Sequence, residues 1–435
     1  MKKYEKYKDS GIEWIGEIPE HWESTKLKFI GESLIGIIYS PDDVVTTGEG
    51  ILVLRSSNIQ NGKLAFEDCV FVNKEVQEKY LTKEGDILLC ARNGSAHLVG
   101  KAAYIDRQNE GVTFGAFMSI VRSELEKYLF YFFNSQVFKA QTGLFSTSTI
   151  NQLTSSTLNN MFISFPRDKQ EQSAIANYLD HKTAEIDELI ADKKRLLELY
   201  EEEKTAIINQ AVTKGINPDA PMKDSGIEWL GEIPEHWEVK RLSWCFEIIG
   251  SGTTPKAGSE EYYLNGEFNW LLTGDLTDDE IWETSKKITQ KALNDYTSLK
   301  KYPENSIVMA MYGATIGKLG ILKIPTAVNQ ACCVMGNPTH FTHLFAFYLL
   351  LAARNEIINM SYGGGQPNIS QELIKSFRVQ VPPIKEQKTI VHHIETGCGL
   401  IDAKTENTKK LIDLLTEYRT ALISEVVTGK IKVTE

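Results

Sequence analysis

The sequence repeats itself, and this repeat constrains the fold more than any other feature. Residues 9–23 read DSGIEWIGEIPEHWE and residues 224–238 read DSGIEWLGEIPEHWE, so the segments differ at one position and are offset by 215 residues. The same offset relates Glu171-Gln172 to Glu386-Gln387, Ile186-Asp187 to Ile401-Asp402, Thr205-Ala206 to Thr420-Ala421 and Val212-Thr213 to Val427-Thr428. One register kept from end to end indicates two tandem halves with a common framework.

Each half contains a long predicted helix. From Glu171 to Lys214 there is neither Pro nor Gly, and about 43 helical residues at 1.5 Å each would span roughly 65 Å. Apolar residues recur by threes, fours and sevens at Leu179, Ile186, Ile190, Leu197, Tyr200, Ile207 and Ala211, and the second copy keeps the register with Ile401, Ile412, Leu415, Leu422 and Val426. A stripe of this length needs an apolar partner, and we expect the two helices to pack together. The residues alone leave both antiparallel and parallel packing open.

Between the repeated segments the halves differ. Residues 24–165 and 239–380 share only a faint pattern of a strand-like run that ends in polar groups, followed by an apolar run that ends in Gly-Lys. Each half then closes with a polar loop of small residues, at 143–151 and 362–370. A shared framework around two divergent regions is typical of a protein that recognises two different ligands with one scaffold.

The net charge of −11 argues against a non-specific nucleic-acid coat protein, which is normally basic. Much of this acidity lies in the two repeated 15-residue segments, each with five acidic residues and no Lys or Arg. The divergent regions are close to neutral, with 13 basic and 14 acidic residues in 24–165 and 13 of each in 239–380. Neutral regions can still carry a basic face, so DNA binding is compatible with this balance, while the acidic, Trp-rich framework is better suited to a protein partner.

Composition also indicates the cellular compartment. The chain opens with MKKYEKYKDSG, which has no apolar signal segment, and it contains no apolar run of 18 residues. Its six cysteines form no CxxC pair. We therefore expect reduced thiols, a cytoplasmic location and no membrane span.

The sequence lacks the motifs of common catalytic sites. GATIGKL at 313–319 has the wrong glycine spacing for a phosphate loop and ends in Leu where Ser or Thr would bind magnesium. His392 and His393 are neighbours on a predicted helix and cannot face one metal ion. A nuclease-like motif, an acidic pair followed by Glu-x-Lys, could be formed only from separate predicted domains, with Asp42 and Asp43 in one and Glu202 and Lys204 in another. GxSxG, HExxH and the Asn/Asp-Pro-Pro-aromatic motif of adenine methyltransferases are absent, so we expect no chemistry from this chain; an enzyme with an unrecognised nuclease or nucleotide site is the alternative.

Further motifs occur twice and in the same order. They are the GIEWxGEIPEHWE segments at 11–23 and 226–238, the helix openings FPRDKQEQ at 165–172 and VPPIKEQ at 381–387, and the helix tails AIINQAVTKGI at 206–216 and ALISEVVTGKI at 421–431. With these motifs the chain resembles, over essentially its whole length, the specificity subunits of type I restriction-modification systems. The first opening departs from the usual Pro-Pro pair, since it reads Phe165-Pro166-Arg167.

The resemblance implies an α+β fold with an internal pseudo-two-fold repeat. Two mixed α/β target-recognition domains would each be followed by a long helix, and the two helices would pack as an antiparallel coiled coil. The implied divisions are 1–165 for the first recognition domain, 166–216 for the first spacer helix, 217–381 for the second recognition domain and 382–435 for the second spacer helix. Each recognition domain would read one half of a bipartite, asymmetric DNA site, and the helices would fix the gap between the half-sites.

The resemblance also implies partners. Two methyltransferase subunits would dock on the helices, restriction/translocase subunits would join them, and the reaction would be adenine methylation. S-adenosylmethionine, ATP and magnesium are then expected on the partner subunits, with no cofactor in this chain. A non-enzymatic protein-binding scaffold with two divergent binding domains is the alternative function.

Candidate DNA contacts follow from the hydrogen-bonding chemistry of bases, because Arg pairs with guanine and Asn or Gln with adenine. In the first half the candidates are Arg55, Ser57, Asn58, Arg92 and Asn93. In the second half they are Lys256, Thr273, Asp275, Tyr312, Gln366 and Asn368. Lys101 and Lys318, at matched Gly-Lys positions, are expected to contact phosphates.

Overall fold

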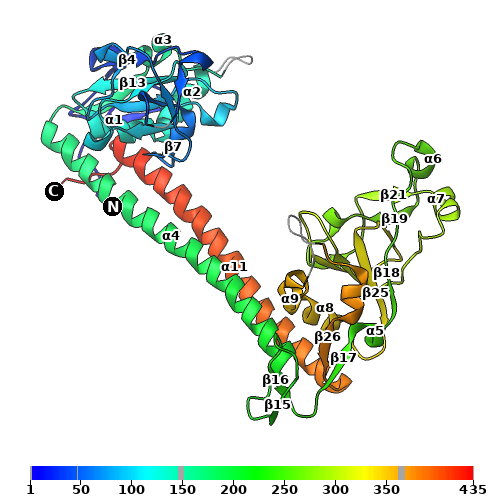
Figure 1. Ribbon diagram of the computed structural model, residues 1–435. Coiled ribbons are helices and arrows are strands. Elements are labelled where there is room, and N and C mark those ends of the chain that lie inside the picture. Colours follow the sequence, from blue (N-terminus) through cyan, green and yellow to red (C-terminus); the bar gives the residue numbers. More distant parts are fainter. Residues whose placement is uncertain (1, 47, 146–150, 361–367, 435) are drawn as a thin grey trace. The chain divides into compact units, whose positions relative to one another are not determined.

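The computed structural model describes residues 2–46, 48–145, 151–360 and 368–434. The chain forms two compact units, which we call unit 1 (Met1–Lys194 with Lys409–Glu435) and unit 2 (Arg195–Thr408). The two long helices are α4 (Lys169–Lys214) and α11 (Ile384–Val427), and each contributes one part to each unit (Figure 1). This division by contacts cuts both helices, whereas the linear division predicted from the sequence keeps them whole.

Unit 1 is built around two small sheets. The first is antiparallel, in the order β11 (Ala102–Tyr104), β10 (Ile87–Cys90), β13 (Met118–Ser123) and β4 (Gly31–Ile35). The second has the order β12 (Thr113–Phe114), β6 (Ile51–Leu54), β9 (Val70–Val72) and β5 (Val44–Val45), with β12 parallel to β6. Two-stranded pairs join β1 (Tyr7–Asp9) to β2 (Glu17–Pro19), β3 (Trp22–Lys26) to β14 (Phe162–Pro166), and β7 (Ile59–Gln60) to β8 (Lys63–Leu64). The shorter helices are α1 (Glu126–Phe133), α2 (Gln136–Phe145) and α3 (Ser155–Asn160).

Unit 2 repeats this plan. Its main sheet has the order β18 (Phe246–Gly250), β25 (Cys332–Pro338), β22 (Ile307–Ala310), β23 (Leu319–Leu322) and β20 (Asp279–Ile281). Its second sheet has the order β21 (Lys286–Ile288), β19 (Phe268–Leu271) and β24 (Ala327–Val328). The pairs are β15 (Met222–Asp224) with β16 (Glu232–Pro234) and β17 (Glu238–Arg241) with β26 (Arg378–Val381). The shorter helices are α5 (Leu242–Cys245), α6 (Glu260–Tyr263), α7 (Gln290–Asp295), α8 (His343–Ala352), α9 (Arg354–Asn359) and α10 (Gln371–Ser376).

The divergent regions therefore share one topology despite their different sequences. The order β11-β10-β13-β4 in unit 1 corresponds to β23-β22-β25-β18 in unit 2, and the parallel pair β12–β6 corresponds to β24–β19. Local signals repeat as well, since Thr154 caps α3 by accepting from the Thr157 amide and Ser370 caps α10 by accepting from the Leu373 amide. The predicted α+β class and the internal repeat are confirmed.

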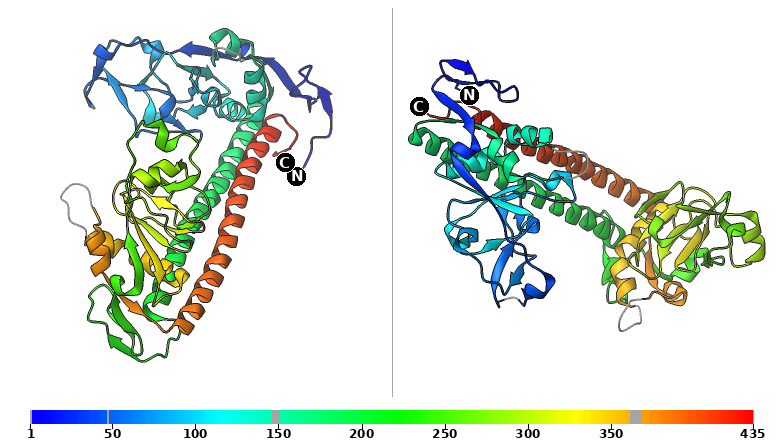
Figure 2. Two further views of the ribbon diagram at one scale, coloured as in Figure 1. Left: turned by 90° about the vertical axis from the view of Figure 1, so that its right-hand side faces the viewer. Right: turned by 90° about the horizontal axis from the view of Figure 1, so that it is seen from above.

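The long helices pair antiparallel, as the resemblance implied and as the residue pattern alone had left open (Figures 1 and 2). In unit 1 the first part of α4 meets the last part of α11, where Arg419 Nε lies 2.8 Å from Asp187 Oδ1. In unit 2 the last part of α4 meets the first part of α11, where Lys204 Nζ lies 2.7 Å from Asp402 Oδ1. Apolar residues of both helices, among them Leu179 and Leu422 in unit 1, belong to the cores of the units. The predicted helix from Glu171 to Lys214 is thus confirmed and begins two residues earlier, at Lys169.

The repeated segment of unit 1 is fixed to α4 by the carboxylate of Glu171. This carboxylate accepts hydrogen bonds from Tyr4 Oη at 2.7 Å and from Trp22 Nε1 at 3.1 Å, and it lies 2.9 Å from His21 Nε2. Trp22 is fully buried. Burial, together with the hydrogen bond to Glu171, raises the pKa of Tyr4 well above its ordinary value, so its hydroxyl remains a donor.

The equivalent joint in unit 2 is simpler. Glu386 lies 2.7 Å from His236 Nε2, but the buried indole nitrogen of Trp237 has no hydrogen-bond partner among the described residues. The carboxylate of Glu171 thus makes three polar contacts in unit 1 and that of Glu386 makes one in unit 2, so the two joints can serve as controls for each other.

We expect Glu171→Ala to lower the free energy of unfolding of unit 1 by about 2–4 kcal/mol, because it leaves buried donors without an acceptor. Glu386→Ala is the matched control and should cost less than about 1 kcal/mol, since its one partner, His236, is half exposed. Hydrogen exchange resolved by unit in the purified chain measures both effects. Equal losses of protection in the two variants would contradict this account of the joint.

Candidate nucleic-acid interface

Two strand ends and a turn meet at one edge of unit 1. The Gly115 amide donates to the Leu54 carbonyl at the end of β6, and the Ala91 amide, just after β10, donates to the Phe117 carbonyl. The Leu153 amide in turn donates to the Ala91 carbonyl at 2.7 Å. We call the resulting surface, formed by residues 55–58, 91–95, 115–117 and 151–153, the unit 1 edge.

The unit 1 edge brings together residues that are far apart in the sequence. Asn93 Nδ2 donates to Ser56 Oγ at 3.1 Å, which connects the segment after β10 to the segment after β6. Arg92 is exposed and its guanidinium carbon lies 5.2 Å from the ring centre of Phe117, which is itself 59% exposed. An exposed guanidinium fork beside a flat ring offers both bidentate hydrogen bonding and stacking. Two predicted residues, Arg92 and Asn93, therefore share one surface.

Asn58, by contrast, has a different role from the base contact expected. Its side chain is fully buried, accepts from the Arg55 amide at 2.8 Å and donates to the carbonyls of Ala65 and Asp68 at 2.9 and 3.1 Å. A buried amide with these bonds has no free edge for a base, so Asn58 holds the turn. Arg55 forms an ion pair with Asp68 at 2.7 Å, and the Ser57 hydroxyl is buried without a hydrogen-bond partner among the described residues.

Unit 2 has an equivalent edge with different side chains. The Asn329 amide donates to the Leu271 carbonyl, the Met311 amide to the Ala331 carbonyl and the Ile369 amide to the Met311 carbonyl. We call residues 272–275, 311–315, 329–331 and 368–370 the unit 2 edge; they include Thr273, Tyr312 and Asn368 from the prediction. Gln366 lies outside the described residues.

Two other predicted residues of unit 2 have local roles. Asp275 is half-buried and accepts from the amides of Leu272 at 2.9 Å and Ser285 at 3.1 Å, so it holds the turn after β19 as Asn58 does after β6. Lys256 is exposed, and its amide donates to Tyr296 Oη. Its loop reaches the unit 2 edge through Thr254 Oγ1, which donates to Gln330 Oε1 at 2.6 Å.

The two predicted phosphate contacts lie in different environments. Lys101 is half-buried and makes no ion pair with any described residue, while Lys318 Nζ lies 3.9 Å from the Asp278 carboxylate. Three residues that were not predicted, Phe117, Asn151 and Gln152, also line the unit 1 edge. No sequence signal separates Phe117 from Phe114, three residues earlier in the same apolar segment, although Phe114 is fully buried and Phe117 is exposed.

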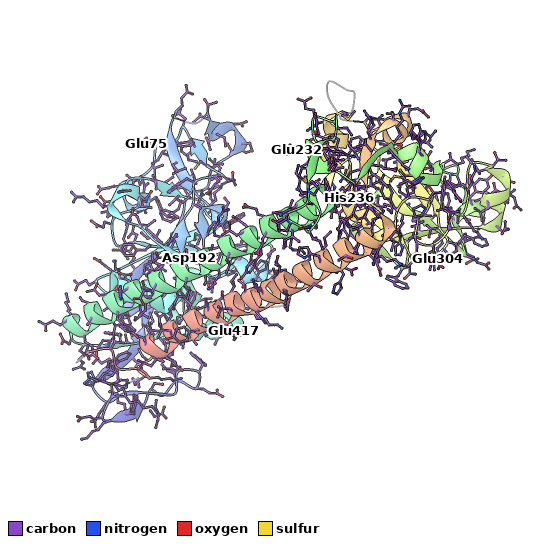
Figure 3. All side chains as sticks on the ribbon, turned by 90° about the horizontal axis from the view of Figure 1, so that it is seen from below. Glu75, Asp192, Glu232, His236, Glu304 and Glu417 are labelled. Atoms are coloured by element: carbon purple, nitrogen blue, oxygen red, sulfur yellow. The ribbon has the colours of Figure 1, made fainter. Side chains whose placement is uncertain are left out.

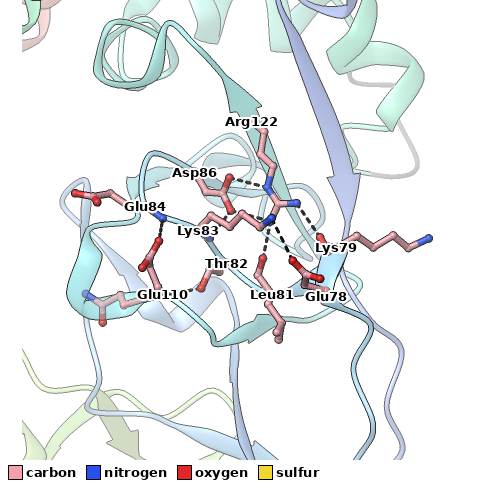
Figure 4. Close-up of polar contacts among 10 residues, drawn as sticks. Glu78, Lys79, Leu81, Thr82, Lys83, Glu84, Asp86, Glu110 and Arg122 are labelled. Atoms are coloured by element: carbon pink, nitrogen blue, oxygen red, sulfur yellow. Dashed lines mark hydrogen bonds and ion pairs between the residues drawn. The ribbon is translucent and has the colours of Figure 1, made fainter.

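A buried ion pair supports the strand that leads to the unit 1 edge (Figure 4). Arg122 on β13 lies 2.9 Å from Asp86 Oδ1 through Nε and 3.0 Å from Oδ2 through Nη2. The same guanidinium donates to the carbonyls of Lys79 and Leu81 at 3.0 and 2.5 Å. Asp86 directly precedes β10, so this network fixes the start of the strand whose far end carries Arg92.

No group of three or more His, Cys, Asp or Glu side chains in the described part of the chain could hold a metal ion. No helix of the described residues is long and apolar enough to cross a membrane.

The comparisons with known proteins agree with this architecture. Residues 19–199 and 234–417 match the family model described as type I restriction modification DNA specificity domain. The type I restriction enzyme MjaIX specificity subunit of Methanocaldococcus jannaschii is 26% identical over 97% of this chain and 96% of that protein. The EcoKI specificity subunit of Escherichia coli K12 is 22% identical over 96% of this chain and 90% of that protein.

Two solved structures share the fold. A chain from the type I R-M system, studied for its complex assembly and conformational transition, matches with a TM-score of 0.72 at 13% identity, over 95% of this chain and 99% of that one. The HsdS subunit of Thermoanaerobacter tengcongensis matches with a TM-score of 0.56 at 14% identity, over 95% of this chain and 98% of that one. Since the family model matches once in each half and covers more than half of the residues, the chain belongs to the type I restriction modification DNA specificity family.

Proposed function

We propose that this chain is the DNA sequence-recognition subunit of a type I restriction-modification complex. The observation that carries the proposal is the equivalence of the unit 1 edge and the unit 2 edge. The same main-chain hydrogen bonds build both edges, but the side chains they present are different. Arg92, Asn93 and Phe117 occupy the unit 1 edge, whereas Thr273, Tyr312 and Asn368 occupy the unit 2 edge. Two such readers in one chain recognise a bipartite and asymmetric sequence.

The chemistry of the edges supports base reading in the major groove. An exposed Arg can donate two hydrogen bonds to the O6 and N7 acceptors of guanine, and Asn can pair in the same way with adenine. Arg55 and Lys256 lie on or beside these edges and complete the candidate contacts, whereas the Ser57 hydroxyl lies buried beneath the unit 1 edge. Lys101 and Lys318 are assigned to phosphates, which position the protein without reading sequence.

The long helices suit a spacer and a docking surface. At 46 residues α4 has a length of about 69 Å and contributes residues to both units, which suits a spacer between two half-sites. Each helix exposes a leucine at an equivalent position, Leu199 at 44% and Leu414 at 61%. Two equivalent apolar contacts fit two copies of one partner, which we assign to two methyltransferase subunits.

The chemistry belongs to the partners in this proposal. Methyltransferase subunits would bind S-adenosylmethionine and modify adenine, and restriction/translocase subunits would use ATP and magnesium. This chain would determine which DNA sequence the complex binds. A cytoplasmic location follows from that role, since its DNA substrate lies there.

Adenine-methylation mapping tests the proposal. Genomic DNA from cells that co-express this chain with its neighbouring methyltransferase should gain one split, asymmetric methylated motif. A complex that assembles and binds S-adenosylmethionine but yields no new motif would support the protein-binding scaffold instead.

Exchange of residues 24–165 for those of another family member should change one half-site and leave the other intact, because these residues lie entirely in unit 1. The same methylation mapping reads the result. A change in both half-sites would show that the two units do not read DNA independently.

Arg92→Ala should relax discrimination at one base pair by about 1–3 kcal/mol, which is roughly 5- to 150-fold in relative affinity. Arg107→Ala is the matched control, since Arg107 is an exposed arginine of the same unit outside the unit 1 edge. Competition binding of the assembled complex to duplexes altered at each position measures both. Uniform weakening at every position in the Arg92 variant would instead make Arg92 a phosphate contact.

A further inference from the structure

Unit 1 contains a cavity of about 580 Å³ beside the long helices. Its walls come from the β7–β8 turn, the loop that precedes β11, helix α2 and the adjoining parts of α4 and α11. Polar side chains, including Asn134, Thr416 and Thr420, form part of the lining, although the two threonine hydroxyls donate to carbonyls of their own helix. The cavity is therefore a concave surface of mixed polar and apolar character, confined to one unit.

The lining of this cavity is strongly cationic. Its basic side chains, apart from Arg419, are Lys63, His97, Lys101, Lys139 and Lys194. Within the described part of the chain none of these five has an ion pair or a side-chain hydrogen bond. The one lining carboxylate, Asp187, is already held by Arg419 Nε at 2.8 Å and Nη2 at 3.2 Å. Four lysines and a histidine thus converge on one cavity without a counter-charge.

This concentration contrasts with the chain as a whole, whose net charge is −11. Acidic side chains such as Glu75, Asp192, Glu304 and Glu417 are exposed on both units (Figure 3). A concave patch of one sign in a low-dielectric wall focuses the electrostatic field and attracts the opposite charge. The unpaired cations of the cavity therefore favour binding of an anionic ligand from outside the chain.

In unit 2 the lysine at the equivalent position lies near a carboxylate of the same unit. Gly100 lies beneath Phe138 of α2, and the equivalent Gly317 lies beneath Arg354 and Ile358 of α9. There the Asp278 carboxylate forms an ion pair with Arg354 and lies 3.9 Å from Lys318 Nζ. Unit 2 therefore supplies its own anion at the position where unit 1 leaves Lys101 free.

We infer that the unit 1 cavity binds consecutive phosphates of the DNA strand that crosses the unit 1 edge, an inference that rests on the proposed function. One short loop connects the two surfaces, with Arg92 at the edge, His97 along the loop and Lys101 in the cavity. The aromatic rings that line the cavity, Phe133 and Phe138, are buried, so they give the base of a free nucleotide no platform for stacking. Phosphate contacts alone match this lining.

The consequence is an electrostatic asymmetry between the half-sites. Phosphate contacts release counterions, and each one adds about 0.9 to the slope of log K against log salt concentration. Unit 1 should account for most of this slope, because the cation of the equivalent Gly-Lys pair in unit 2 is shared with Asp278.

The test uses the complex of this chain with its methyltransferase and a duplex that carries the mapped split site. Binding is measured over a range of salt concentrations for wild type, for the triple variant Lys101→Gln/Lys139→Gln/Lys194→Gln and for the control Lys318→Gln. The triple variant should lose close to three units of slope, about one per lysine, and should weaken cognate and non-cognate duplexes equally. The control should lose less than one unit, and the methylated motif should be unchanged in both variants.

Neutral methylphosphonate linkages beside the half-site read by unit 1 give a second readout. They should weaken binding by wild type and have little further effect on the triple variant. An unchanged slope in a triple variant that still assembles and melts like wild type would overturn the inference, as would a change in the methylated motif. Loss of methyltransferase binding would assign the cavity to a protein contact instead.

Two further results would point to a different ligand or a different function. A stabilisation by inorganic phosphate or ATP that the triple variant loses, with the DNA slope unchanged, would assign the cavity to a free phosphate ligand. Absence of any split methylated motif with the wild-type complex would overturn the proposed function itself.

Discussion

The antiparallel pairing of α4 and α11 is the contact on which both units depend. Each core is completed by the end of a helix from the other half of the sequence, since Val427 is buried in unit 1 and Val212 in unit 2. Buried donors fasten these ends: Tyr128 Oη donates to the Val427 carbonyl at 2.9 Å and Gln380 Nε2 to the Val212 carbonyl at 2.6 Å. Neither half can bury its apolar surface without the other, which explains why the register of the repeat is kept so closely along the framework.

On this framework each unit presents a surface that is free to vary. The hydrogen bonds that build the edges run between main-chain groups, as from Ala91 to Phe117 and from Met311 to Ala331, so they place few demands on side chains. Asn58 and Asp275 close the turns, and the neighbouring positions can then change without loss of the fold. Separation of the residues that fold the turn from those that face outward is what allows one topology to support two different readers.

Charge is distributed according to the same division. Acidic residues are concentrated in the repeated segments, whereas the cavity of unit 1 gathers cations from the β7–β8 turn, α2 and α4. Affinity that does not depend on sequence would then come from one unit, and discrimination between bases from both edges. An uneven distribution of this kind would let the complex be held on DNA by one half-site while the other is tested.

The sequence by itself determined the repeat, the two long helices and the class of protein, because these depend on periodic apolar residues and on motifs that are local in the chain. The residue pattern alone did not decide the direction of helix pairing, since an apolar stripe with a mixed domain between its copies is compatible with either. The family resemblance implied the antiparallel direction, which was confirmed by the tertiary structure. Only the tertiary structure showed the common topology of the divergent regions, whose strands of two to seven residues are too short for a readable alternation. The sequence could not show that Asn58 and Asp275 stabilise turns, because a polar residue in a turn has the same sequence signature whether it bonds to the backbone or faces solvent. The cationic cavity could not be predicted either, because Lys63, Lys139 and Lys194 are far apart in the sequence. Only the folded chain places them around one cavity, whose single carboxylate is already paired with Arg419.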